Sequence, residues 1–439
     1  MGDPQWTPAV QQEKDIGIGF FATASPGIGG KLRTMPEDFI VDEVPILPPR
    51  DDNGPYAIIQ VKAENWENNR LLHYMAGALK IARERISFAG TKDKRAITTQ
   101  FYSIKTDEES VKSINIPHLK IKYMYQSNDP LKLGHLHGNN FWIRIKDTVI
   151  KGVELDSTLT SITEVLENLN GFPNYFGVQR FGSLRPITHT IGEYLVKGDI
   201  EGAVMRYIGQ STPKEDPNIQ RIRNQVYRSK DFASALEEYP SELYFEKKML
   251  KHLADRPEDF IGALRSLPRN LQMMFVHAYQ SYMFNIILSK RIEQGLSLQK
   301  PEVGDVVLPL DDHGNVDNNR PMMVKEYNQN TMEKRCLERK AVITGTLFGT
   351  QVELSEGPMG EIEQKLFKTE KIDRDNFNII ALPDLSSRGW RRGLLCSFYN
   401  FDVKREEENQ AVLRFRLPKG SYATCLLREF MKSHDLLNY

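Results

Sequence analysis

The sequence has few of the features that mark secreted, membrane-bound or metal-dependent proteins. Only three cysteines occur in 439 residues, and their wide spacing forms neither a disulfide framework nor a zinc pattern. No apolar run approaches the roughly 20 residues that a membrane helix requires. The N-terminus has neither the basic start nor the apolar stretch of a signal peptide. We therefore expect a cytoplasmic protein without a membrane segment.

An excess of charge of either sign is also absent. The 58 Lys and Arg residues balance the 58 Asp and Glu residues, so the formal net charge is zero. This balance argues against an indiscriminate polyanion binder, but it permits RNA binding if basic residues gather on one surface. Basic residues cluster locally at Lys92/Lys94/Arg95, Arg180/Arg185 and Arg388/Arg391/Arg392.

Metal and nucleotide sites lack their usual patterns. His135 and His137 are close in sequence, but the other histidines supply no third ligand at a recognisable spacing. The Gly-rich segments 345–349 and 357–360 lack the lysine of a phosphate loop. We expect neither a metal ion nor a cofactor.

The length predicts two or three domains, because a single core rarely organises so many residues. Strand-like segments dominate both ends of the chain, whereas helical patterns dominate between about 185 and 385, with candidate helices at 189–208, 241–255 and 270–291. In the first part of the chain, the order strand, strand, helix, strand, turn, strand predicts an α+β protein with a largely antiparallel sheet. The β-rich ends around a helical middle also favour an inserted domain and a core assembled from both termini.

The most informative stretch is FAGTKDKRAITTQ at 88–100. Its outgoing part continues as a β-branched strand over 97–104, so the charged part forms a tight turn between strands. Asp93 lies between Lys92 and Lys94, and neighbouring cations keep a carboxylate ionised and available as a nucleophile or base. The alternative is a solvated turn whose charges pair locally.

Two further residues have both a structural and a functional interpretation. Phe39 opens a strand over 39–44 that places Phe39, Val41 and Glu43 on one face. Its ring is either core or a stacking platform for a base. Asn139 falls in a predicted turn at 138–139, where its amide either folds onto its own backbone or reads the edge of a uracil.

The segment 171–182, GFPNYFGVQRFG, combines four aromatic residues with three glycines and Arg180. It is either an aromatic hinge or a surface that stacks against an unpaired base. Near the C-terminus, a strand over 410–417 closes at 418–420 and a final helix follows, ending near Lys432.

Five of these motifs together resemble one family. PEDFIVDE, FAGTKDKRAITTQ, LHGNNFWIRI, PNYFGVQRFG and FRLPKGSYATCLLRE look like the successive motifs of the TruD family of tRNA pseudouridine synthases, in the family's order over nearly the whole chain. The large middle segment is more similar to archaeal and eukaryotic members than to compact bacterial ones.

The resemblance implies a catalytic domain with the pseudouridine-synthase antiparallel sheet, interrupted by a more helical α/β TruD-specific domain. We expect the catalytic domain at 1–168 and 389–439 and the insertion at 169–388. The implied activity is isomerisation of a uridine in tRNA, at position 13 in most of the family, without a cofactor. The implied partner is therefore tRNA, with a flipped uridine in the active site.

The resemblance also assigns residues. The family nucleophile maps onto Asp93, and the uridine-contacting set maps onto Phe39, Asn139 and Phe415. A basic residue precedes the PEDF motif in the family, and here it is Arg33, an ionic partner for Asp93.

Two other classes of function are compatible with parts of the pattern. A glycosidase would pair Asp93 with Glu43 as two opposed carboxyl groups. A non-catalytic RNA chaperone would bind tRNA through the same surface and leave the uridine unchanged.

Overall fold

A computed structural model describes residues 4–92 and 94–439 of the chain. A large, mainly antiparallel sheet runs through it in the order β16-β17-β9-β4-β7-β5-β8, with β3 paired to β9 and β6 paired to β7. Its strands are β3 (Gly29–Lys31), β4 (Phe39–Pro45), β5 (Tyr56–Glu64), β6 (Ile86–Phe88), β7 (Ile97–Ile104), β8 (Leu119–Ser127), β9 (Leu136–Thr148), β16 (Tyr399–Glu407) and β17 (Gln410–Pro418). Among the described strands of this sheet, only β4 and β7 pair in parallel. The predicted α+β class with a largely antiparallel sheet is confirmed.

The strand alternation predicted around Phe39 is also confirmed. In β4, Phe39, Val41 and Glu43 are buried and Asp42 is exposed. Strand β7 has the predicted bounds, because its β-branched and aromatic residues favour an extended backbone.

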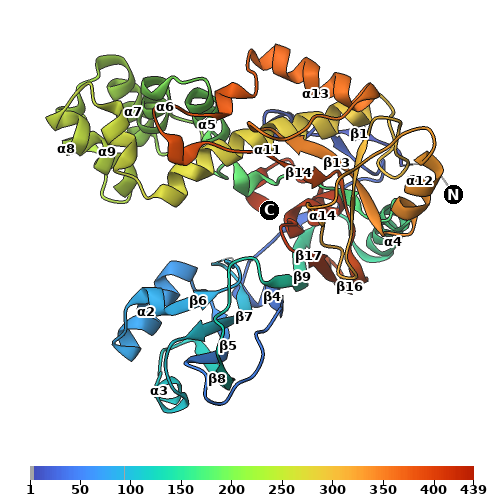
Figure 1. Cartoon of the computed structure of the whole chain (residues 1–439), viewed down its shortest axis with the longest axis horizontal. Coiled ribbons are helices and arrows are strands. Elements are labelled where there is room, and N and C mark those ends of the chain that lie inside the picture. Colours follow the sequence, from blue (N-terminus) through green and yellow to red (C-terminus); the bar gives the residue numbers. More distant parts are fainter. Residues whose placement is uncertain (1–3, 93) are drawn as a thin grey trace.

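Part of the sheet forms a small region with its own apolar core. Strands β5 to β8 pack there with helices α2 (Asn68–Leu79) and α3 (Glu108–Lys112). Figure 1 shows this region, coloured blue to teal, apart from the helical middle of the chain. We call its buried residues the second core: Ala57, Ile59, Val61, Ala63, Leu71, Leu72, Met75, Ala76, Ile86, Tyr102, Ile104, Val111 and Ile116.

A much larger first core extends from Ile16 to Tyr439 and includes β4, β9, β17 and most of the helices. Helix α11 runs through it as the longest helix among the described residues (Figure 1). The remaining helices are α1 (Gln11–Lys14), α4 (Gly152–Asn168), α5 (Thr188–Val196), α6 (Ile200–Gly209), α7 (Pro217–Ser229), α8 (Phe232–Glu238), α9 (Tyr244–Asp255), α10 (Phe260–Arg265), α11 (Arg269–Glu293), α12 (Gln329–Leu337), α13 (Gly357–Glu370) and α14 (Ala423–Met431).

The predicted helical middle is present, with two additions. The expected helix at 189–208 is divided into α5 and α6 at Gly198, whose φ of +81° is a left-handed conformation that favours glycine. The middle also contains a four-stranded sheet in the order β12-β11-β13-β14. These strands are β11 (Val306–Pro309), β12 (Met322–Met323), β13 (Ala341–Leu347) and β14 (Trp390–Gly393), and two short pairs join β1 (Thr7–Pro8) to β2 (Phe20–Phe21) and β10 (Phe172–Pro173) to β15 (Leu395–Cys396).

Both ends of the chain contribute to the first core. Strand β17 pairs with β9 over eight residues, and β9 pairs with β4 on its other side. Helix α14 is tied to the N-terminal segment by Arg428, whose buried guanidinium forms an ion pair with Glu13 at 2.6 Å. The boundaries of the proposed insertion at 169–388 remain a prediction.

Within the described ranges, no helix combines the length and the apolar character that crossing a bilayer would require.

Candidate functional site

Three phenylalanine rings form an aromatic stack with one edge-on member on one face of the large sheet. Phe141 in β9 pairs in register with Phe415 in β17, and their rings stack at 5.2 Å between centroids. The Phe39 ring meets Phe141 edge-on at 6.4 Å. Phe39 and Phe415 are 1% and 2% exposed, whereas Phe141 is 9% exposed, so Phe141 is the most accessible of the three.

Arg33 covers part of this stack. Its guanidinium carbon lies 4.1 Å from the centre of the Phe39 ring, a cation–π distance. Arg33 itself has a positive φ of 55°. The contact brings a permanent positive charge to the edge of the ring stack.

Asn139 lies in β9, two residues before Phe141, and not in the predicted turn. Residues 138 and 139 pair with β4 on one side and β17 on the other, and this pairing overrides the local turn preference of Gly-Asn. A Cβ atom at Gly138 would meet the carbonyl oxygen of Leu417 at 2.1 Å, so glycine is required by the close approach of β17. The prediction of a turn at 138–139 was wrong.

The amide oxygen of Asn139 has a distinctive environment. Its Oδ1 atom is buried and accepts no hydrogen bond from any described residue. Because a buried polar atom without a partner costs roughly 1–3 kcal/mol, such atoms often mark ligand sites. Asn139 pairs in register with Glu43 of β4 and with Leu417 of β17, which places it on the same sheet face as Phe141.

A buried ion pair joins this face to the segment that follows β6. Lys92 Nζ lies 2.6 Å from Glu43 Oε2, and the two side chains are 7% and 0% exposed. The other Glu43 oxygen accepts a hydrogen bond from the backbone N–H of Phe101 at 3.4 Å. The side-chain amide of Gln100 donates to the carbonyl of Gly90 and fixes the backbone just after β6.

Asp93, the predicted nucleophile, lies outside the described residues. Its neighbour Lys92 is paired with Glu43, so the positive charge of Lys92 is compensated by that carboxylate.

Burial, together with the charge of Glu43, raises the pKa of Tyr102 above its usual range. Tyr102 therefore stays neutral, and its hydroxyl group lies 3.0 Å from Gln100 Oε1 and 3.2 Å from Asn68 Oδ1, so its single proton is shared between these two acceptors.

The aromatic motif at 171–182 is mostly internal. Phe172, Tyr175 and Phe181 are fully or nearly fully buried in the first core, where they pack against other apolar side chains. The motif acts as a packed connection between the middle of the chain and the C-terminal strands. Its polar contribution comes from Asn174, described below.

The remaining histidine and arginine clusters are largely structural. The His137 ring stacks on His313 at 3.7 Å, and burial together with the neighbouring His313 lowers the pKa of His137. In the described part of the chain, no group of three or more His, Cys, Asp or Glu side chains is placed to hold a metal. Arg185 and Arg391 are turned inward onto Glu246 and Glu363, at 3.5 and 3.6 Å.

Sequence reasoning missed Phe141 and the Glu43–Lys92 pair. Phe141 follows Asn139 by two residues in a strand, so the period of two could have placed both on one face. The ion pair joins residues 49 positions apart, and no local pattern indicates it.

Comparison with known proteins identifies the family to which this chain is similar. A family model described as tRNA pseudouridine synthase D (TruD) matches residues 15–430. A protein of Methanococcoides burtonii named "Probable tRNA pseudouridine synthase D" is 41% identical over 430 residues, covering 97% of this chain and 98% of its own length. A protein of the same name from Thermococcus sibiricus is 39% identical, covering 94% of this chain and 97% of its own length.

The fold agrees as well. A crystal structure of a Methanosarcina mazei protein, described as "Putative tRNA pseudouridine synthase D (TruD)", matches with a TM-score of 0.85 and 37% sequence identity, covering 99% of this chain and all of that one. This match confirms the predicted fold class. The chain therefore belongs to the TruD family of tRNA pseudouridine synthases.

Proposed function

We propose that this protein isomerises a uridine in tRNA to pseudouridine, at position 13 as the family resemblance implies. One observation supports the proposal most directly: the buried Oδ1 atom of Asn139 has no partner among the described residues and lies on the same sheet face as the rings of Phe39, Phe141 and Phe415. An amide oxygen accepts a hydrogen bond from the N3–H of uracil, and the rings supply an apolar surface beside it.

The reaction breaks the N1–C1′ bond of the uridine, turns the uracil and forms a bond between C5 and C1′. N1 gains a proton and the C5 proton is released to solvent, so no redox partner is required. Asp93 is proposed to supply the carboxylate, either by attacking C1′ or by assisting a route through the ribose.

The other residues hold the flipped base. Extracting a uridine from its stack costs a few kcal/mol, which contact with the ring stack that includes Phe39 and Phe415 offsets. Asn139 orients the uracil edge. Arg33, whose guanidinium lies over Phe39, is proposed as the ionic partner that keeps Asp93 charged.

The division into domains is part of the proposal. Residues 1–168 and 389–439 form the catalytic domain, and 169–388 form the insertion. The pairing of β17 with β9, and of β9 with β4, supports this division because strands from both ends of the chain carry the candidate site.

The glycosidase alternative is disfavoured by the environment of Glu43. A glycosidase needs a second carboxyl group facing the first across the substrate. Glu43 is fully buried and bonded to Lys92, so neither a water molecule nor a sugar reaches it.

Mass mapping of pseudouridine in a tRNA transcript incubated with the purified protein tests the proposal. We expect one new pseudouridine at position 13. Release of free uracil would identify a glycosidase. Tight binding without any pseudouridine would identify a chaperone, and either result would reject the proposal.

A further inference from the structure

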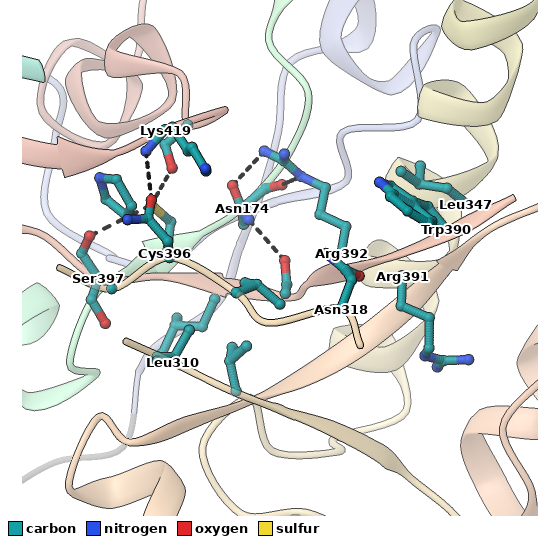
Figure 2. A pocket seen from close by; sticks show the side chains of 18 residues that line it. Asn174, Leu310, Asn318, Leu347, Trp390, Arg391, Arg392, Cys396, Ser397 and Lys419 are labelled. Carbon is teal, nitrogen blue, oxygen red and sulfur yellow. Dashed lines mark hydrogen bonds between the residues drawn. The ribbon is translucent and has the colours of Figure 1, made fainter. Parts of the chain in front are cut away.

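A polar hollow opens beside the end of β17. It has a volume of about 250 Å³, below the roughly 300 Å³ at which pockets for drug-sized ligands begin, so it suits a small group. Figure 2 shows side chains from three parts of the chain around it: Asn174, Arg392 and Lys419. A loop at 310–318 closes one side.

The charged residues that line this pocket are all basic. Of the 18 residues that line it, three are Arg or Lys and none is Asp or Glu. Arg391 forms an ion pair with Glu363, so Arg392 and Lys419 are the basic residues of the lining that remain to bind an anion. The adjacent Asp311 accepts hydrogen bonds from the backbone N–H groups of His313 and Asn315, so its carboxylate is used within its own loop.

Arg392 is a half-buried cation without a carboxylate partner among the described residues. Its Nε donates to the carbonyl of Asn174 at 3.2 Å, Nη2 to Asn174 Oδ1 at 2.5 Å, and Nη1 to the carbonyl of Gly420 at 3.0 Å. Three of its five N–H groups are thus bonded to neutral acceptors. Burial lowers the pKa of Arg392, which means that its charge is poorly compensated.

A contact with Phe176 fixes the guanidinium further. The guanidinium carbon lies 4.2 Å from the centre of the Phe176 ring, and the Arg180 guanidinium approaches the same ring at 5.6 Å. Two arginines therefore contact one ring, and neither forms an ion pair with any described carboxylate. Their uncompensated positive charge favours the binding of an anion.

The pocket is connected to the candidate uridine site. Pro418, which lines it, pairs in register with Gly138, next to Asn139. Lys419 Nζ donates to the carbonyl of Gly134 at 3.0 Å, and Gly134 N–H donates to the carbonyl of Ala89, which directly follows β6. An anion in the pocket would therefore lie beside Pro418, whose strand partner Gly138 directly precedes Asn139.

The rim indicates which kind of anion fits. Trp390 lies at the pocket edge on β14 and is 63% exposed, although large aromatic rings are usually buried. An exposed indole beside a cationic hollow is the arrangement that stacks a base while basic groups hold the adjoining phosphate.

We infer that this pocket binds a backbone phosphate of the substrate RNA through Arg392 and Lys419, with a neighbouring base stacked on Trp390. The inference rests on the proposed function because it takes the ligand to be the tRNA. It adds a second anchor that fixes the strand relative to the flipped uridine.

Two variants of exposed residues test the phosphate contact and the base contact separately. For each variant, the affinity of the full chain for fully converted tRNA is measured over a range of salt concentrations. Lys419→Gln should weaken binding and reduce the slope of log K against log [salt] by about 0.7–0.9, the value for one lost phosphate contact. Trp390→Leu should weaken binding about tenfold, because stacking is worth roughly 1–3 kcal/mol, and leave the slope unchanged. Lys365→Gln and Tyr327→Leu are the matched exposed controls, and neither should change affinity or slope.

Arg392→Lys tests the guanidinium, with thermal unfolding as the check on folding because Arg392 also holds Asn174 and Gly420. We expect a reduced affinity for tRNA. If Lys419→Gln and Trp390→Leu both bind like their controls, the inference is wrong, even when pseudouridine formation is normal. Stabilisation by inorganic phosphate with an unchanged salt slope for tRNA would assign the pocket to free anions and would also overturn it.

Discussion

The two apolar cores differ in size and in what they contribute to the candidate site. The first core carries Phe39, Asn139 and Phe415 on strands that are paired on both sides. The second core supports β6 and β7, the strands that flank the turn containing Asp93 in sequence. The residues proposed to hold the base thus lie on the first unit, and the strands that precede and follow residue 93 in the sequence lie on the second.

The link between the two units is narrow. Strands β4 and β7 are in register over three residue pairs, from Ile40 with Ile97 to Asp42 with Thr99. The Glu43–Lys92 ion pair lies directly beside this pairing. The comparison indicates that geometry within each unit is fixed by its own packing, whereas geometry between them depends on a few polar and backbone contacts.

The largest effect is expected from breaking the ion pair. Lys92→Met leaves the buried Glu43 carboxylate without a counter-charge and should cost about 3–5 kcal/mol. The double variant Lys92→Met/Glu43→Gln should recover much of this stability, because no buried charge remains, but not the turnover. Chemical denaturation and pseudouridine formation on both variants provide the measurements. Full turnover in the double variant would show that the pair does not position the turn.

A cavity in each core should affect mainly its own unit. Leu72→Ala in α2 and Leu413→Ala in β17 each remove a fully buried side chain, at an expected cost of about 2–5 kcal/mol. Amide hydrogen exchange should accelerate in β5 for the first variant and in β9 for the second. Equal acceleration in both strands for either variant would mean that the two cores unfold as one.

A smaller, pH-dependent effect is expected at Asp38, which anchors β4 beside Phe39. Although burial raises its pKa, hydrogen bonds from Lys146, the Met35 N–H and Arg144 outweigh this effect and hold the pKa of Asp38 below its usual value. Because the folded pKa is depressed, this stabilisation is present above about pH 4 and is lost as the pH falls through the folded pKa.

Asp38→Asn should therefore cost about 2 kcal/mol at neutral pH, and this difference from the wild type should shrink below pH 4. Denaturant unfolding of both proteins between pH 3 and 7 measures it. A difference that stays constant with pH would exclude the carboxylate charge as its cause.

Local patterns predicted the elements well and their partners poorly. The period of two located β4 and β7, and the helical period located α11, because these signals depend on neighbouring residues. The small sheet of β11 to β14 was not expected, because its strands are short and separated by long connections.

The candidate site residues were predicted from motifs, whereas the contacts around each of them became known only from the fold. Nothing local indicates that Gly138 and Asn139 form the middle strand of three, or that Glu43 meets Lys92. The sequence also does not show that Arg392 has no carboxylate partner among the described residues, because it shows only a cluster with Arg388 and Arg391 and not which arginine pairs with a carboxylate.

The most direct test of the account concerns the carboxylate itself. Tritium release from tRNA labelled at C5 of uridine should be measured for the wild type and for Asp93→Asn, with tRNA binding measured on the same samples. The account predicts that binding changes little and that tritium release is abolished. Tritium release at the wild-type rate in Asp93→Asn would contradict it.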